Sequence, residues 1–289
     1  MQWLNAVLQG MLLGGLYALL AAGLSLMFGV MRIVNLAHGV LAMLAAYLGF
    51  VLVNNIGLPW VVGLVLVVVI MAAVGFVLQW GLFNRALAKA GLAPLLVAFG
   101  LAVVLTQLLQ EIFSADNRSI DIGMIGTNSI QISSDIYIGV FPLITFVAGV
   151  VVIAALQVFL NSTPLGRAMR ATSDDPDTVK LMGIDNRRVY AMATALALAT
   201  VGLAGMFIGT KTQFSPTYGD LVLIFAFEAV IIGGLGSLWG TLVGGIVLGV
   251  AQAVGNQINP AYGLLIGNLV FLAILAFRPQ GLLPKAVTT

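Results

Sequence analysis

The chain contains no cysteine and very little charge. Of its 289 residues 8% are charged and one is histidine, whereas 61% are hydrophobic and the mean hydropathy is +1.12. The missing cysteine excludes disulfides and thiolate metal sites, and one histidine cannot form a zinc site alone. A net charge of +2 without a basic stripe gives no sign of a nucleic-acid partner. Because soluble domains carry about 25% charged residues, this composition indicates an integral membrane protein.

Motifs for nucleotide hydrolysis and for acyl transfer are missing as well. No lysine follows a glycine, so the chain has no Gly-Lys-Ser/Thr loop to hold phosphates. A serine hydrolase would pair Ser25 with His38, but Ser25 lies in GLSLM, which lacks the nucleophile-elbow pattern. We therefore expect no catalytic residue, no cofactor and no metal site in this chain.

Long apolar stretches predict the architecture. A helix needs ~20 apolar residues to cross the hydrocarbon core of a bilayer, and the sequence offers eight or nine such stretches. We expect an all-α polytopic membrane protein with at least one broken or re-entrant helix, and a single integral-membrane domain over residues 1–289. The predicted spans are 4–30, 36–53, 59–83, 92–113, 137–160, 189–209, 221–235, 240–257 and 262–277.

The positions of lysine and arginine predict the orientation. With nine crossings, ten of the twelve basic residues fall on one side, which the positive-inside rule makes cytoplasmic. The loop 111–136 carries four acidic residues against Arg118 alone and falls on the other side, as does Lys211. This arrangement predicts an outside N-terminus and an inside C-terminus.

Small residues recur at helical spacing in several of the predicted spans. Small side chains on one helix face let two backbones approach closely, which is how helices associate within lipid. We interpret these positions as ordinary bundle packing, and the alternative is a sliding surface that moves during transport. The residues are Gly10, Gly14, Ala18, Gly205, Gly209, Gly236, Gly240 and Gly244.

Two polar interruptions are candidates for a translocation pathway. Asn35 and His38 lie three residues apart in MRIVNLAHG and would share a helix face. They would either line an interrupted helix at depth or cap the second helix from a cytoplasmic turn, and the residues favour neither. Glu228 is the acidic residue inside a predicted span, followed by a glycine-rich break. Its role is equally open between pathway and structure. The pathway candidates are Asn35, His38, Glu228, Gly233, Gly234 and Gly236.

The hydrophilic segment 161–188 is the most unusual part of the chain, because it holds nine of the 22 charged residues. Thr163-Pro164 predicts the start of one short helix, and Asp175-Pro176 predicts the capped start of a second that ends at Gly183. Arg167 and Arg170 would share a face of the first helix. The alternative is a solvated loop with surface ion pairs, but so much capping favours a rigid element on which a soluble partner docks.

Three motifs of the chain resemble the Liv-type permease subunits of ATP-binding-cassette importers for branched-chain amino acids, and the length and NLAHG form are closer to the H-like type. The motifs are GLYALLAAGLSLMFGVMRIVNLAHG, TPLGRAMRATSDDPDTVKLMGIDNRRV, and FEAVIIGGLGSLWGTLVGGIVLG followed by RPQGLLP. The resemblance extends over essentially the whole chain.

The resemblance implies a non-catalytic subunit that forms half of a pathway for branched-chain or other hydrophobic amino acids, or related small amides, in the bacterial cytoplasmic (inner) membrane. It implies four kinds of partner: a second permease, two cytoplasmic ATP-binding subunits that hold ATP and Mg, an extracytoplasmic solute-binding protein, and lipid. It also places ATPase coupling at residues 161–188, with the matching residues Gly166, Arg167, Arg170, Ala171, Asp174, Asp175 and Gly183. The competing hypotheses are a proton-coupled secondary transporter that uses Glu228 and His38, and a passive channel.

Overall fold

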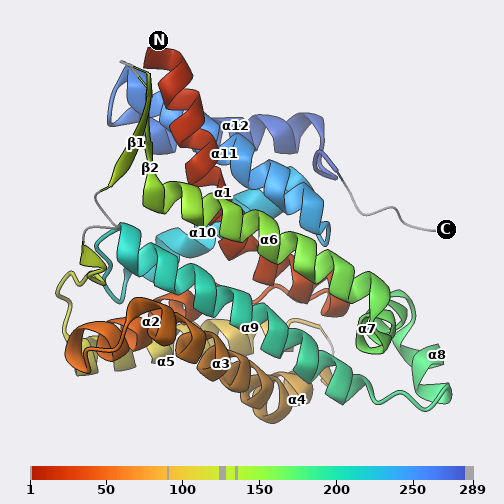
Figure 1. The fold of residues 1–289 in the computed structure, drawn as a ribbon. Coiled ribbons are helices and arrows are strands. Elements are labelled where there is room, and N and C mark those ends of the chain that lie inside the picture. Colours follow the sequence, from red (N-terminus) through yellow and green to blue (C-terminus); the bar gives the residue numbers. More distant parts are fainter. Residues whose placement is uncertain (1, 90, 124–127, 134–135, 284–289) are drawn as a thin grey trace.

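The computed structural model describes residues 2–89, 91–123, 128–133 and 136–283. The described chain is a bundle of helices with one short hairpin at one end (Figure 1). In chain order its elements are α1 (Gln2–Met31), α2 (His38–Phe50), η1 (Val51–Asn55, a π-helical continuation), α3 (Trp60–Leu78), η2 (Gln79–Phe83, also π-helical), α4 (Asn84–Leu87), α5 (Ala93–Phe113), β1 (Ser129–Ser133), β2 (Ile136–Gly139), α6 (Val140–Ser162), α7 (Pro164–Asp174), α8 (Pro176–Leu181), α9 (Asn186–Lys211), α10 (Tyr218–Gly233), α11 (Leu238–Ile258) and α12 (Tyr262–Phe277).

Seven helices of the described chain are long and apolar enough to cross a bilayer. They are α1, α2 with η1, α3 through α4, α5, α6, α9 and α11. The helices α10 and α12 have 16 residues each, fewer than the ~20 of a straight crossing. The predicted class, a polytopic helical membrane protein, is therefore confirmed, and the choice between eight and nine crossings stays a prediction.

The helix α1 lies at the centre of the bundle and packs against α11, α9, α6 and α10. Small residues allow its close approach to α11. A Cβ at Gly14 would lie 2.5 Å from the Cα of Ile246, and one at Gly10 would lie 2.6 Å from the Cα of Val250. The predicted glycine face of α1 thus packs helix backbones against each other, and a sliding role stays a prediction. For Gly236 the prediction was wrong, because this residue lies in the turn between α10 and α11 and on no helix face.

The chain between α1 and α2 is a non-helical segment inside the bundle, hereafter the first broken passage. After Met31, residues 32–37 are not helical, and His38 begins α2 with its ring Nε2 2.8 Å from the carbonyl oxygen of Leu20. Since Leu20 lies well inside α1, α2 starts beside the body of that helix and not at its end. The predicted interrupted helix is thereby favoured over a surface turn. One expectation was wrong: Asn35 precedes the helix, so it shares no helix face with His38, and neither side chain caps α2.

A second broken passage meets the first. The helix α9 ends at Lys211, residues 212–217 are not helical, and α10 begins at Tyr218. A Cβ at Gly219 would lie 2.9 Å from the Cα of Val40, so the starts of α10 and α2 touch backbone to backbone. Both short helices therefore begin within the bundle, where the freed backbone groups are surrounded by protein.

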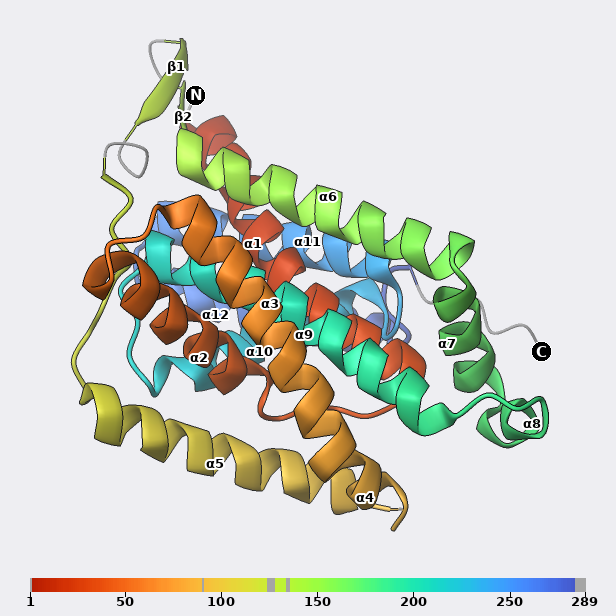
Figure 2. The same cartoon turned by 60° about the horizontal axis from the view of Figure 1, so that its bottom comes forward.

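The two ends of the bundle differ in structure. Strands β1 and β2 pair antiparallel beside the first turns of α1, where Gln9 Nε2 donates to the carbonyl oxygen of Tyr137 at 2.6 Å (Figure 2). This hairpin was not predicted, because we read 111–136 as a loop and 137–160 as a span, whose first three residues belong to β2 instead. At the opposite end α7 and α8 project from the bundle (Figure 2). We call these the hairpin end and the knob end.

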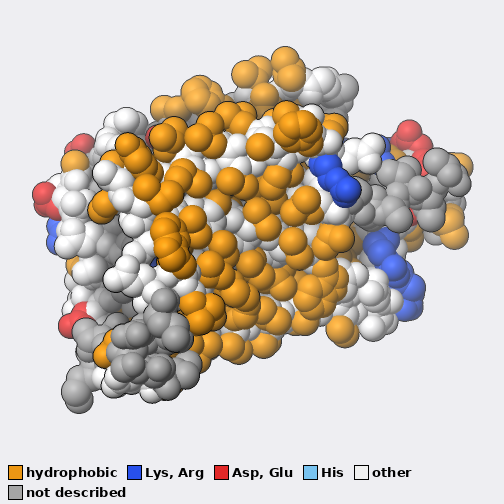
Figure 3. Space-filling model, turned by 90° about the horizontal axis from the view of Figure 1, so that it is seen from above, with side chains coloured by type: hydrophobic (Ala, Val, Ile, Leu, Met, Phe, Trp, Pro, Cys, Tyr) orange, Lys and Arg blue, Asp and Glu red, His pale blue; other side chains and the backbone are white. Residues whose placement is uncertain are grey.

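The basic residues of α4, of the knob helices and of the start of α9 lie at the knob end, whereas Lys211 ends α9 at its far end, and the orientation in the membrane stays a prediction. The Asn84 side chain in α4 donates to the carbonyl oxygen of Arg187 at 3.4 Å, which places the α4 loop beside the start of α9. Lys285 lies outside the described residues. On the face that Figure 3 shows, the surface between the two ends is a broad hydrophobic belt, with Lys, Arg, Asp and Glu side chains near its ends. Such a belt matches the hydrocarbon layer of a bilayer.

Candidate functional site

The predicted coupling segment forms two short capped helices. Thr163 accepts a hydrogen bond from the N–H of Gly166 at 2.9 Å at the start of α7. Asp175 accepts from the N–H groups of Asp177 and Thr178 at 3.0 and 3.1 Å at the start of α8. Both helices have proline in the first turn, as predicted. The hydroxyl of Thr178 and these two N–H groups lower the pKa of the Asp175 carboxyl, so the cap remains charged well below neutral pH.

Hydrogen bonds tie this pair of helices, hereafter the knob (residues 163–185), to the ends of three long helices. Ser173 Oγ donates to the carbonyl oxygen of Gly29 at 2.6 Å, which joins α7 to the end of α1. Asn186 Nδ2 at the start of α9 donates to the carbonyl oxygen of Pro176 at 2.6 Å. Arg170 Nη1 donates to Asn161 Oδ1 of α6 at 3.2 Å. A displacement of the knob would therefore act on α1, α6 and α9 together.

The outer surface of the knob is unusual because two large apolar side chains stand among its charges. Leu181 is 88% exposed and Met182 is 76% exposed. The predicted coupling residues divide between this surface and the packed side. Gly166 is buried against α6, and Ala171 is partly buried. The exposed members are Arg167, Arg170, Asp174, Asp175 and Gly183.

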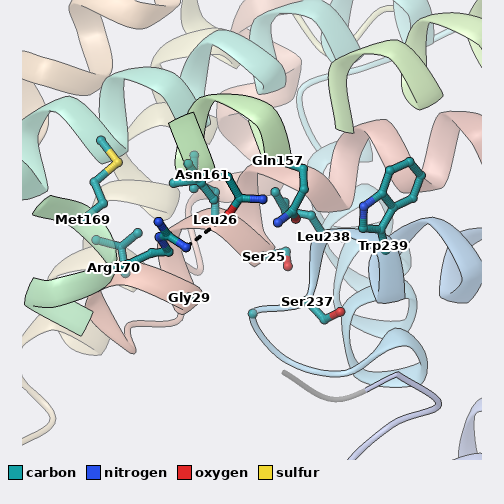
Figure 4. Close-up of a pocket in the computed structure, with 13 residues that line it drawn as sticks. Ser25, Leu26, Gly29, Gln157, Asn161, Met169, Arg170, Ser237, Leu238 and Trp239 are labelled. Atoms are coloured by element: carbon teal, nitrogen blue, oxygen red, sulfur yellow. Dashed lines mark hydrogen bonds between the residues drawn. The ribbon is translucent and has the colours of Figure 1, made fainter. Parts of the chain in front are cut away.

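A pocket of about 270 Å³ lies between the knob and the bundle (Figure 4). The ends of α1 and α6, the helix α7 and the turn before α11 line it, with Gln157, Arg170 and Trp239 among the lining side chains. Ser25 also lines it, and the Ser25 hydroxyl oxygen is buried without a hydrogen-bond partner among the described residues. The contact between the knob and the bundle is therefore incompletely packed.

The pathway candidates do not form one cluster. His38 is fully buried and faces α1, where its ring contacts the Leu20 carbonyl. Asn35 is also fully buried, and its Oδ1 accepts from the N–H of Ala37 at 3.0 Å. Both side chains stabilise the broken passage from within. Of the two placements that the sequence left open, the structure shows the interior one, and a role toward a transported molecule stays a prediction.

Glu228 lies in one of two polar pairs that join helices inside the bundle. Asn268 of α12 donates to Glu228 Oε1 at 2.8 Å when its side-chain amide nitrogen faces the carboxyl group. The hydroxyl of Tyr17 donates to Gln252 Oε1 of α11 at 2.6 Å, and the Tyr17 ring packs 4.8 Å from that of Phe225 on α10. Sequence reasoning missed Tyr17, Gln252 and Asn268, because each stands alone in its span without a motif.

The helix α10 also begins earlier than predicted, at Tyr218 and not at 221. It therefore carries a second acidic residue, Asp220, in its first turn, where the helix dipole stabilises a negative charge.

The glycines after Glu228 form a turn that the chain's C-terminal segment covers. Gly234 and Gly236 have φ values of 111° and 79°, which other residues rarely adopt, so α10 ends here as predicted. The N–H groups of Leu282 and Leu283 donate to the carbonyl oxygens of Ile232 and Gly233 at 2.8 and 2.9 Å. The segment after α12 thus satisfies carbonyl groups at the end of α10.

Comparison with known proteins gives a consistent result. Residues 6–275 match the family model described as the permease component of the branched-chain amino acid transport system. The chain is 26% identical to the high-affinity branched-chain amino acid transport permease BraD of Pseudomonas aeruginosa, over 98% of this chain and 96% of BraD. It is 27% identical to LivH of Escherichia coli K12, over 98% of this chain and 96% of LivH.

A more distant relative and one solved structure resemble the chain less closely. LivM of Escherichia coli K12 is 32% identical over 42% of this chain and 29% of its own length. The structure titled PsaBC from Streptococcus pneumoniae in complex with Fab has a TM-score of 0.51 at 14% identity, and covers 96% of this chain and 93% of its own. That likeness supports the fold alone. Because the family model matches residues 6–275 of the 289 in this chain, this multi-pass membrane protein belongs to the permease components of branched-chain amino acid transport systems.

Proposed function

We propose that the chain is one permease subunit of an ATP-driven importer for branched-chain or similar apolar amino acids in a bacterial inner membrane. It would pair with a second permease and form half of the translocation pathway. Its relatives BraD and LivH are named as branched-chain amino acid permeases, and both align over almost the full chain. The chain itself would be non-catalytic, with ATP and Mg²⁺ held by two separate cytoplasmic subunits and substrate delivered by an extracytoplasmic binding protein.

The observation that supports an external energy source best is the exposed surface of the knob. Leu181 and Met182 are largely exposed beside charged side chains at an end of the molecule that lies outside the hydrophobic belt. Apolar side chains surrounded by charge are typical of a protein interface with an apolar centre and a polar rim. The positive-inside rule places this end in the cytoplasm, where an ATPase would reach it.

The contacts of the knob suggest how force would enter the bundle. An ATPase that moved the knob would pull on the end of α1 through Ser173 of α7, and on the start of α9 through the bond of Asn186 to Pro176 of α8. Those two helices flank both broken passages, since α1 leads into residues 32–37 and α9 leads into residues 212–217. The pocket beneath the knob provides room for such a movement.

Charge reversal on the knob tests this function. In proteoliposomes that contain the complete transporter, the double variant Arg167→Glu and Arg170→Glu should abolish ATP-driven leucine uptake. The matched control is Arg85→Glu, a charge reversal in α4 at the same end of the bundle, which should retain uptake. Leucine uptake by the purified chain without any ATPase would contradict the proposal. Uptake that survives ATP depletion and collapses with a protonophore would support the proton-coupled alternative through Glu228 and His38.

A further inference from the structure

A second, smaller cavity of about 90 Å³ lies among α1, α9 and α10, toward the hairpin end. Its walls are apolar and aromatic, and include Tyr17, Tyr218 and Phe225 together with leucines of α1. The single charged side chain that lines it is Lys211, the last residue of α9. The cavity borders the second broken passage, because Thr212 and Tyr218 belong to its lining.

Lys211 has no partner for its charge in the part of the chain that the structure describes. Its side chain is partly buried, and the ammonium group makes no hydrogen bond or ion pair with the described residues. The ion pairs of the described chain all lie elsewhere, at Asp116–Arg118, Asp177–Lys180 and Asp185–Arg188. A charge that faces an apolar cavity without a partner is costly, and a carboxylate brought into the cavity would remove that cost.

Besides Lys211, the cavity wall carries the hydroxyl groups of Tyr17, Thr212 and Tyr218, and two of these three are already occupied. The Tyr17 hydroxyl donates to Gln252, and the Thr212 hydroxyl donates to the carbonyl oxygen of Ile208 at 3.1 Å. The ammonium of Lys211 is therefore the charged donor that an entering anion would meet. The aromatic rings of Tyr17 and Phe225, 4.8 Å apart, offer an apolar surface next to it.

The size of the cavity limits what it holds. One water occupies about 30 Å³, so the space corresponds to roughly three waters, and drug-sized ligands need several hundred Å³. A carboxylate and its α-carbon fit this volume, and the rest of a larger molecule would extend beyond it. Because the cavity lies toward the end opposite the knob, a molecule that arrives from outside the cell would reach it first.

We propose that this cavity binds the carboxylate of an apolar amino acid as it enters the pathway, with the Lys211 ammonium as its counter-ion. The proposal rests on the proposed function, since it supposes that amino acids pass through this chain. It assigns to Lys211 a selective role: an amide or amine of the same shape, without the carboxylate, would lose this contact.

The absence of cysteine from the chain allows a direct test. Lys211→Cys removes the charge, and 2-aminoethyl methanethiosulfonate restores an ammonium through a disulfide to the new thiol, whereas the 2-sulfonatoethyl reagent adds a negative charge. Gln213→Cys, exposed and outside the cavity lining, is the matched control. Complexes with the unchanged chain, treated with both reagents, account for cysteines of the partner subunits.

In the reconstituted transporter, Lys211→Cys should raise the leucine concentration for half-maximal uptake by about 10- to 100-fold, as expected for loss of a charge-assisted hydrogen bond. The cationic reagent should restore much of the uptake and the anionic reagent should not. Leucine should slow the modification of Cys at 211 but not at 213, and leucinamide should protect neither.

Three results would overturn the proposal. Equal effects of the two reagents would show that charge at this position is irrelevant. Loss of the assembled complex in Lys211→Cys, without protection by leucine, would show that Lys211 pairs with an acidic group of a partner subunit. Unchanged leucine uptake in an assembled Lys211→Cys complex would remove the role altogether. Failure of the unchanged transporter to take up leucine would instead count against the proposed function, so the two failures are distinguishable.

Discussion

Replacement of Gly14 by alanine tests the packing of α1 on α11, on which the core of the bundle depends. The added Cβ would lie 2.5 Å from the Cα of Ile246 and 2.6 Å from the carbonyl oxygen of Gly245. Both neighbours are backbone atoms, so no side chain can rotate away and the two helices must separate. Extra volume in a packed core costs about 1–3 kcal/mol, which corresponds to a fall of roughly 2–10 °C in the unfolding midpoint.

The matched control is Gly100→Ala on α5, where no atom lies within 4 Å of the new Cβ. Alanine is about 1 kcal/mol better than glycine in a helix interior, so this variant should unfold at the same or a higher temperature. The assay is the loss of monodisperse protein on heating in detergent, with circular dichroism recorded in parallel. If Gly14→Ala proved as stable as Gly100→Ala, the close approach of α1 and α11 would be wrong.

Three further substitutions address single contacts. Tyr17→Phe removes the hydroxyl that donates to Gln252, and should lower the free energy of unfolding by about 1 kcal/mol, the order found for hydrogen bonds inside membranes; an unchanged thermal midpoint would speak against the bond. Glu228→Gln retains an acceptor oxygen for Asn268 and should preserve assembly and ATP-driven uptake, so an assembled but inactive variant would favour a proton-carrying carboxyl. Ser173→Ala cuts the bond to the end of α1, and should reduce the uptake obtained per ATP hydrolysed in proteoliposomes while ATPase activity persists; unchanged coupling would exclude that bond from force transfer.

Hydropathy was sufficient to locate the membrane helices, because each one is mostly apolar along its length. The predicted span 92–113 differs from α5 only in its first residue, and the prediction 189–209 falls within α9. The caps of the knob were equally predictable. Thr163 and Asp175 act on N–H groups two or three residues ahead, so their role depends on local sequence alone.

Contacts between distant residues could not be predicted in this way. The same MRIVNLAHG sequence suits a surface turn or a buried break, and the choice depends on whether His38 reaches the Leu20 carbonyl of another segment. The pairing of Glu228 with Asn268 depends on how α10 meets α12. In the sequence, Lys211 was notable only as a basic residue on the side opposite the predicted cytoplasmic side. The cavity that it lines forms only when three helices pack together.

Cross-linking from the tip of the knob tests the central claim, that a nucleotide-hydrolysing partner acts on this chain through residues 163–185. Leu181→Cys places one thiol at a side chain that is 88% exposed, and Asn117→Cys places one at an exposed position in the loop toward the hairpin end. In the complete transporter, the cysteine at 181 should cross-link to an ATP-binding subunit and stay unreactive to membrane-impermeant thiol reagents added to intact cells. The cysteine at 117 should behave in the opposite way. Labelling of position 181 from outside the cell would contradict the account.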